Sequence, residues 1–377
     1  MSLPWAGQLM TRWRRLTSAA GLATGIAAAG VGIVIAAEKI AVGRMRAQPD
    51  PAAAEPFGQL RGRPVPVVAD DGVPLYTEIS GQEDAPLTLV FCHGYTLSQE
   101  VWHYQRQDFA SEARLVFWDQ RGHGRSGRSP RDHISIDQLG ADLAAVLAAT
   151  VPSGGPAILI GHSMGGMTIM ALAALRPDLF GETVAGVVLI STAAAEVDAV
   201  SWLPAPLRPA ARLAAPPLLR GSARGLRAEL VERFRQSAGD LAFLFTRLIA
   251  FGDPDISPAA VDFLESTIRA TPIDVIADFF IALRDHDKRA ALPVLGRVPV
   301  TVMTGGADRL IPARLSEDLA AAIPGAQLIV VPGAGHAIIL ERPDMVTEEI
   351  ADLTALALDA PAPPRTGPRR PGARRRR

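Results

Sequence analysis

Residues 157–166 read Ala-Ile-Leu-Ile-Gly-His-Ser-Met-Gly-Gly, the most informative local pattern in this chain. The apolar residues 157–160 predict a buried strand, and residues 164–175 behind them predict a helix. Glycines two residues before and two residues after Ser163 relieve steric crowding in a sharp turn between these elements. A serine on such a strand–turn–helix connection has its hydroxyl exposed at the edge of a sheet. We therefore expect Ser163 to be a nucleophile.

On both sides of this stretch, apolar runs of strand length alternate with helical segments. This pattern predicts an α/β fold, in which helices cover both faces of a mostly parallel central sheet. Asp71-Gly72 is a turn signal between the runs 65–69 and 75–79, which predicts an antiparallel opening hairpin. The expected strands that follow are residues 87–92, 115–118, 157–160, 184–190, 300–303 and 328–331, and the expected helices are residues 137–150, 164–175, 313–323 and 343–358.

Residues 201–292 break the alternation, since they contain helical patterns and no convincing strand. An insertion of this size after a sheet strand predicts a helical cap. Seven of the twelve phenylalanines lie in it, and we expect most of them to pack the cap onto the core. The others are candidates for lining an apolar substrate pocket.

A serine hydroxyl needs a base to take its proton, and the base needs a carboxylate to fix its tautomer. His336 is the expected base, because it lies in a Gly-Ala-Gly-His loop between the last apolar strand and the final helix. Asp308 follows the strand 300–303 and is the expected acid, with Asp198 as the alternative. Four of the other six histidines are assigned other roles: His162 packs beside the turn, and His123, His133 and His286 are surface or loop residues.

The attacked carbonyl develops negative charge, which backbone amides can stabilise. The amide of Met164, at the start of a helix, is one candidate donor. The second is the amide of Tyr95, in the loop His93-Gly94-Tyr95 after the strand 87–92, where Gly94 permits close approach of the backbone.

These motifs together resemble the α/β-hydrolase superfamily in its capped, serine-nucleophile branch, from about Val65 to Leu358. The resemblance implies a catalytic triad of Ser163, Asp308 and His336, and an oxyanion hole formed by the amides of Tyr95 and Met164. It also implies that residues 119–126 form a structural loop near the site. The motifs that carry the resemblance are His93-Gly94, Asp119-Gln120-Arg121-Gly122-His123-Gly124-Arg125-Ser126, the turn at Ser163, Gly306-Ala307-Asp308 and Gly335-His336.

The resemblance excludes branches with aspartate as the nucleophile, such as epoxide hydrolases and haloalkane dehalogenases. Serine-bearing relatives include monoacylglycerol lipases, carboxylesterases and perhydrolases. We expect cleavage of apolar or lipid-like carboxylic esters through an acyl-enzyme on Ser163. Two alternatives stay open: the same triad acting as a cofactor-free haloperoxidase (perhydrolase), thioester hydrolase or carbon–carbon bond hydrolase, and a membrane-tethered binding protein without activity.

No cofactor, metal or specific nucleic acid is expected. The histidines lack H-E-x-x-H spacing, the chain has a single cysteine, Cys92, and no G-x-G-x-x-G opens a first βα unit. The expected partner is a small-molecule acyl ester or lipid, and the pattern does not indicate an oligomeric state.

The two ends of the chain suggest a membrane. Residues 18–37 carry no charge and are long enough to cross a bilayer as a helix, about 30 Å. We therefore predict a membrane-associated protein with a single-pass anchor of unknown sidedness; a cleaved signal peptide and an ordinary apolar helix are the alternatives. Residues 361–377 hold seven arginines and no acid, and are candidates for contact with anionic lipid. The predicted division is tail and anchor 1–47, linker 48–64, core 65–200, cap 201–292, core 293–358 and a disordered Arg-rich tail 359–377.

Overall fold

The computed structural model describes residues 39, 42–195, 197, 209 and 239–359. Its centre is an eight-stranded sheet with the order β1-β2-β4-β3-β5-β6-β7-β8. β2 pairs antiparallel with both β1 and β4, and all other neighbours are parallel. The strands are β1 (Arg63–Val68), β2 (Pro74–Gly81), β3 (Thr88–Cys92), β4 (Arg114–Trp118), β5 (Ala157–His162), β6 (Val184–Ile190), β7 (Val300–Gly305) and β8 (Gln327–Val331).

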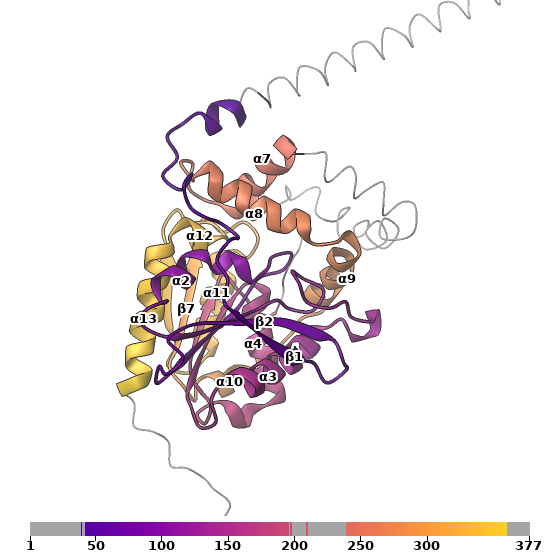
Figure 1. The fold of residues 1–377 in the computed structure, drawn as a ribbon, viewed down its shortest axis with the longest axis vertical. Helices are drawn as coiled ribbons and strands as arrows, with labels where there is room; N and C mark the ends of the chain where they lie inside the picture. Colours follow the sequence, from indigo (N-terminus) through magenta and orange to yellow (C-terminus); the bar gives the residue numbers. More distant parts are fainter. Residues whose placement is uncertain (1–38, 40–41, 196, 198–208, 210–238, 360–377) are drawn as a thin grey trace, which may run out of the picture.

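Two separate hydrophobic clusters show that both faces of the sheet are covered. Along β3, Val90 and Cys92 face one cluster while Leu89 and Phe91 face the other, because side chains alternate along a strand. The first cluster includes residues of α3, α4, α10 and α11, and the second includes residues of α13 (Figure 1). The helices of the core are α2 (His103–Asp108), α3 (Ile136–Thr150), α4 (Met164–Leu175), α10 (Leu292–Leu295), α11 (Ala313–Ala322), α12 (Ile338–Glu341) and α13 (Pro343–Asp359).

The structure confirms the predicted α/β fold. The opening hairpin pairs Arg63 with Ile79 and Val68 with Pro74, and Gly72 in its turn has a positive φ of 86°. A mostly parallel sheet follows, with the predicted alternation of strands and helices. The hairpin forms one edge of the sheet and β8 the other.

The described part of the cap is helical. It consists of α7 (Gly239–Ala250), α8 (Pro258–Ala270) and α9 (Ile273–Arg284), which lie along one end of the sheet in Figure 1. Of residues 201–238, also assigned to the cap, only residue 209 is described. Phe243, Phe251, Phe263 and Phe279 are buried, in agreement with the expectation that most of the cap phenylalanines pack onto the core.

Residues 48–60, which belong to the predicted linker, make specific contacts with the cap and the core. The carboxylate of Asp50 accepts hydrogen bonds from the Ser257 hydroxyl and the Ala259 amide at the start of α8, at 2.6 and 2.9 Å. The ring of Phe57 stacks on Phe263, with centroids 4.7 Å apart. Because only residues 61 and 62 separate this segment from β1, it connects the cap to the edge of the sheet.

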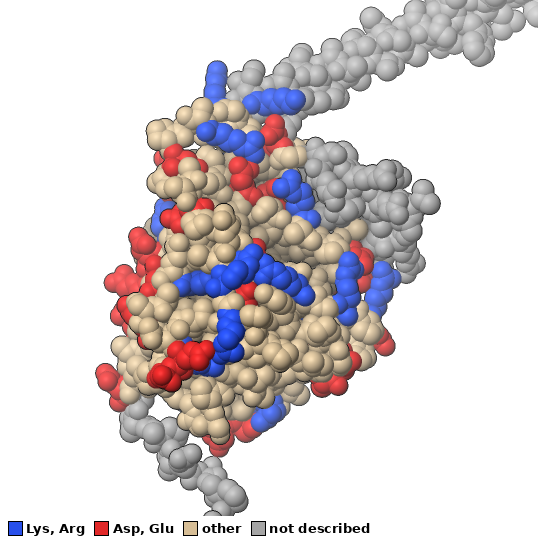
Figure 2. Space-filling model, in the orientation of Figure 1, with Lys and Arg blue, Asp and Glu red and all other residues tan. Residues whose placement is uncertain are grey.

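The prediction of a membrane-anchored protein is corrected. Within the described residues, no helix has both the length and the apolar character needed to cross a bilayer. The longest of them, α13, has 17 residues and carries acidic side chains, including Asp344, Glu348 and Asp352; the acidic groups beside it are visible in Figure 2. The predicted anchor at residues 18–37 lies outside the described residues, as does the Arg-rich tail from residue 360.

The loop after β4 is held by a buried ion pair. The guanidinium of Arg121 donates two hydrogen bonds of 2.6 Å to the carboxylate of Asp142 on α3, and both side chains are fully buried. A second carboxylate, Asp71 from the opening hairpin, accepts from Arg121 at 2.7 and 3.1 Å. These bonds hold the pKa of Asp71 well below its usual range. The loop of residues 119–126 therefore joins the opening hairpin, β4 and α3.

We predict that Arg121→Gln lowers the free energy of unfolding by about 3–5 kcal/mol, because Asp142 would remain buried without its cation. Urea unfolding at pH 7 measures this change. Arg176→Gln is the control: Arg176 pairs with Asp178 at the surface, where both side chains are about half exposed, so a loss below about 1 kcal/mol is expected. Equal losses in the two variants would contradict the assigned role of the buried pair.

Candidate active site

Ser163 stands in a strained turn between β5 and α4. Its φ of 53° and ψ of −117° are uncommon for a residue with a side chain. The glycines beside it are required by close approach: a Cβ on Gly165 would lie 2.1 Å from the carbonyl oxygen of Cys92, and one on Gly161 would lie 2.7 Å from the Gly165 backbone. The first turn of α4 therefore lies directly against the ends of β3 and β5. Strain at one serine, surrounded by supporting backbone, is typical of a nucleophile.

Asp308 and His336 are in direct contact. Nδ1 of His336 lies 2.8 Å from Oδ2 of Asp308, whose side chain is fully buried. The other oxygen, Oδ1, accepts from the amides of Leu310 and Ile311, both at 2.8 Å. Because the carboxylate only accepts, Nδ1 carries the proton and Nε2 is left as the basic nitrogen.

The loops that carry this pair follow adjacent parallel strands. Asp308 follows β7, and His336 follows β8. The amide of Ala307 donates to the carbonyl of Ala334 at 2.8 Å, which fastens the two loops together. Parallel strands end at the same edge of a sheet, so both loops project on the side where β5 delivers Ser163.

His162, the neighbour of Ser163 in the turn, contacts the loop that carries His336. Nε2 of His162 donates to the backbone carbonyl of His336 at 3.0 Å, and the two rings are 4.9 Å apart. Ser163 and His336 are largely buried, with 9% and 8% of their surface exposed. The sequence predicts only that His162 packs beside the turn. It also forms a hydrogen bond with the loop of the expected base.

Tyr95 lies in the loop after β3, beside the strained turn. A Cβ on Gly94 would lie 2.9 Å from Nδ1 of His162, so only glycine allows this approach. The Tyr95 hydroxyl donates to the carbonyl of Ile276 on α9, and the Thr271 hydroxyl donates to the carbonyl of Thr96 at 2.9 Å. Met164 is the first residue of α4, where helix amides point outward. The backbone amides of Tyr95 and Met164 stay predicted oxyanion donors.

Several histidines around the site are buried and neutral. Burial lowers the pKa of His93 to about 4 and the pKa of His123 and His162 to about 3. His123 and His286, expected at the surface or in loops, lie in loops and are 0% and 5% exposed, so neither is a surface residue. Sequence motifs could not show this, because burial depends on the helices packed over each ring. Neutral rings add no positive charge that would compete with His336.

Sequence reasoning also missed Glu341. Its buried carboxylate accepts a 2.8 Å hydrogen bond from the amide of Gly335, next to His336. The only sequence feature that could have indicated Glu341 is its position as a single acidic residue directly after the apolar run 337–340.

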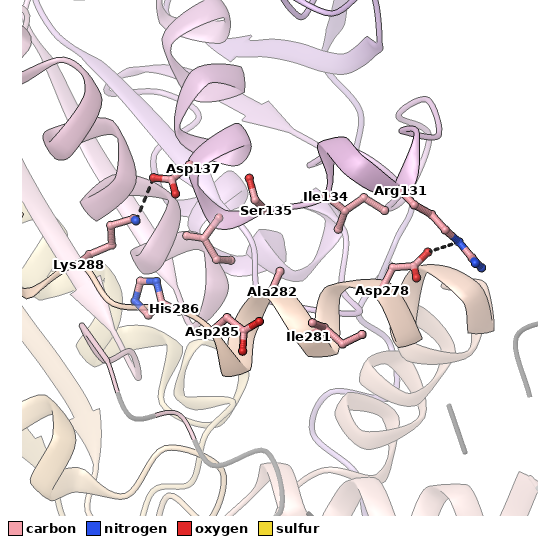
Figure 3. Close-up of a pocket in the computed structure, with 11 residues that line it drawn as sticks. Arg131, Ile134, Ser135, Asp137, Asp278, Ile281, Ala282, Asp285, His286 and Lys288 are labelled. Carbon is pink, nitrogen blue, oxygen red and sulfur yellow. Dashed lines mark ion pairs between the residues drawn. The ribbon is translucent and has the colours of Figure 1, made fainter. Parts of the chain in front are cut away.

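A cavity of about 490 Å³ lies apart from these residues, between α9 and the start of α3 (Figure 3). Two ion pairs close its ends, Lys288–Asp137 at 2.9 Å and Arg131–Asp278 at 3.2 Å. His286 lines it and donates from Nε2 to the carbonyl of Ala193 at 3.1 Å. None of its lining residues belongs to the expected triad, so we assign these contacts to the attachment of α9 to the core.

Comparison with known sequences is consistent with this geometry. Residues 89–349 match the model of the alpha/beta hydrolase family. The chain is 28% identical to a pimeloyl-[acyl-carrier protein] methyl ester esterase of Sodalis glossinidius over 290 residues, which cover 75% of this chain and 99% of that protein. It is 25% identical to a dihydrolipoyllysine-residue acetyltransferase component of the acetoin cleaving system of Pseudomonas putida, covering 76% of this chain and 68% of the relative.

Among solved structures, the esterase RhEst1 from Rhodococcus sp. ECU1013 is similar with a TM-score of 0.62 and 25% identity. The alignment covers 78% of this chain and 99% of the esterase.

We predict that Asp308→Asn lowers kcat for an ester substrate by about 10³–10⁴, because the amide no longer selects the His336 tautomer with Nε2 as the base. Steady-state kinetics on the purified variant measure this. Asp198→Asn tests the alternative acid and is expected to keep kcat within about threefold. A large loss in Asp198→Asn, with Asp308→Asn active, would reverse the assignment.

We predict that His286 contributes to acid sensitivity. Burial lowers its pKa to about 4, whereas an unfolded histidine has a pKa near 6.5. The unfolded state binds more protons between these values, so the free energy of unfolding falls as the pH drops through this window. In His286→Gln, the loss between pH 7 and pH 5 is expected to be about 2 kcal/mol smaller than in the wild type. Urea unfolding at the two pH values measures the difference, and an unchanged loss would contradict it.

Proposed function

Because this chain belongs to the alpha/beta hydrolase family and is an ester-cleaving hydrolase, we propose that it works through an acyl-enzyme on Ser163. The observation that carries the proposal is the 2.8 Å contact between His336 and the buried Asp308. The loop of His336 also accepts a hydrogen bond from His162, the residue next to the strained Ser163. A serine, a histidine of defined tautomer and a buried carboxylate are the groups that acyl transfer needs.

In the proposed first half-reaction, Nε2 of His336 takes the proton from the Ser163 hydroxyl as its oxygen attacks the ester carbonyl. The bond to the alcohol breaks after the resulting imidazolium returns the proton to the leaving oxygen. Asp308 stabilises the imidazolium without taking its proton. The amides of Tyr95 and Met164 would receive the negative charge of the tetrahedral intermediate, in a site with little water.

In the second half-reaction, His336 activates a water molecule that attacks the acyl carbonyl. Collapse of this intermediate releases the carboxylic acid and returns the proton to Ser163. The chemistry needs no metal or organic cofactor.

We further propose that the substrate is an ester with an apolar acyl group. The cap supports this, because helices α7, α8 and α9 lie at one end of the sheet (Figure 1) and carry buried apolar residues. Tyr95 and Thr96, in the loop of the expected oxyanion donor, contact α9 and the end of α8. The cap therefore lies next to the place where the acyl carbonyl would bind, and its apolar side chains favour an acyl chain over a charged group.

The test combines a fluorophosphonate probe with p-nitrophenyl esters from acetate to decanoate. The wild type is expected to bind one probe per chain, and Ser163→Ala to bind none and to lose at least about 10⁴-fold in kcat/KM. A rate that rises with acyl length in the wild type would support the apolar substrate; a rate confined to acetate would contradict it.

Ser191→Ala is the matched control. Ser191 also follows a parallel strand and also has a positive φ, 48°, but it is fully buried. It is expected to retain probe binding. Probe bound by Ser163→Ala, or a folded wild type that binds none, would overturn the assigned nucleophile.

A further inference from the structure

The loop that carries His336 is held from three sides. The amide of Ala337 donates to the carbonyl of Ala250, at the end of α7, at 2.8 Å. The carbonyl of His336 itself accepts from His162 at 3.0 Å. The amide of Gly335 donates to Glu341 at 2.8 Å. Three of the backbone groups at residues 335–337 therefore have defined partners, one of which belongs to the cap.

Glu341 binds the cap and the base loop with one carboxylate. It ends the short helix α12 and is only 6% exposed. Besides Gly335, it accepts from the amide of Asp253 at 2.7 Å and from the amide of Gly252 at 3.2 Å. Hydrogen bonds to a carboxylate are about twice as strong as neutral ones. The same carboxylate would be costly to bury if these donors moved away.

The two segments that Glu341 joins are also in backbone contact. A Cβ on Gly335 would lie 2.5 Å from the amide nitrogen of Gly252, and one on Gly252 would lie 2.1 Å from the carbonyl oxygen of Gly333. No side chain fits between the cap segment 250–253 and the loop 333–337. A shift of the cap segment must therefore be followed by the loop, or it must break the contacts at Glu341.

We propose that Glu341 is a positioning residue, which couples the docking of cap segment 250–253 to the placement of His336. This inference rests on the proposed role of His336 as the base. With the cap docked, the backbone amides of Gly252, Asp253 and Gly335 all donate to the Glu341 carboxylate. These bonds fix the position of the loop 333–337 relative to the sheet. When the cap segment leaves, the carboxylate loses two of these three donors, and the loop loses its support from Ala250 as well.

The direct test is Glu341→Gln, a substitution of equal size. Its amide nitrogen would face backbone N–H groups, so at least one of the bonds to the two segments is lost. We expect kcat and the rate of fluorophosphonate labelling to fall about ten- to hundredfold, with KM within threefold, because the base is misplaced while the substrate surface is intact.

Arg342→Gln is the matched control. Arg342 donates to the carboxylate of Asp253 at 2.8 Å, so it also attaches the cap segment to the α12–α13 region, but its two side-chain bonds reach Asp253 and the Glu341 carbonyl rather than the base loop. It is expected to lower the melting temperature by an amount similar to Glu341→Gln while kcat stays within threefold. Equal losses of kcat in the two variants, or a change confined to the melting temperature, would overturn the proposal.

Hydrogen exchange separates this inference from the proposed function. In Glu341→Gln, the amides of both 250–253 and 333–337 are expected to exchange faster than in the wild type. In Arg342→Gln, which keeps the Glu341 bonds, the increase at 333–337 is expected to be clearly smaller than in Glu341→Gln. This readout holds even if the wild type cleaves no ester, a result that would refute the function but not the coupling. If Glu341→Gln does not fold, Glu341→Asp replaces it, because its shorter side chain cannot reach both segments. Unchanged hydrogen exchange and an unchanged kcat in Glu341→Asp would overturn the inference.

Discussion

Close backbone packing beneath Ser163 is the constraint on which the rest of the site depends. The first turn of α4 approaches the end of β3 so closely that a methyl group on Gly165 would collide with the carbonyl of Cys92. Glycine at this position allows the helix to start directly at the edge of the sheet and leaves Ser163 with a positive φ. The strain is tolerated because β3, β5 and β6 each have a hydrogen-bonded neighbour on both sides, which supports the backbone around the turn. The same packing directs the amides of the first turn of α4 toward the place where a carbonyl would be attacked.

Asp308 and His336, the proposed acid and base, are held in a different way, by hydrogen bonds between loops. Asp308 uses one oxygen for local amides and the other for His336, so the carboxylate is fixed before it contacts the ring. The loop of His336 is in turn supported by His162 and Glu341. Burial keeps His162 neutral, so it supports the base loop without adding a positive charge beside the imidazolium that would form there.

The cap contributes to both halves of the site. Through Ile276 and Thr271 it contacts the loop of the expected oxyanion donor, and through Ala250 it contacts the loop of the expected base. Residues 48–60 add a third attachment, with Asp50 at the start of α8. A cap attached in this way is in contact with the loops of the proposed catalytic groups, and not only with a substrate pocket.

Local patterns in the sequence determined the strands, the helices, the turn at Ser163 and the glycine-rich loops, because hydrophobic period and glycine placement act over a few residues. The resemblance of the motifs then identified Asp308 and His336, which the structure brings into contact. The membrane prediction failed because it rested on the composition of one uncharged run, and the described helices include none that could span a bilayer. Only the tertiary structure decided that His123 and His286 are buried and that Glu341 joins the cap to the base loop. Gly252 and Glu341 are 89 residues apart, and no local pattern records a contact that exists only once the cap has packed onto the sheet.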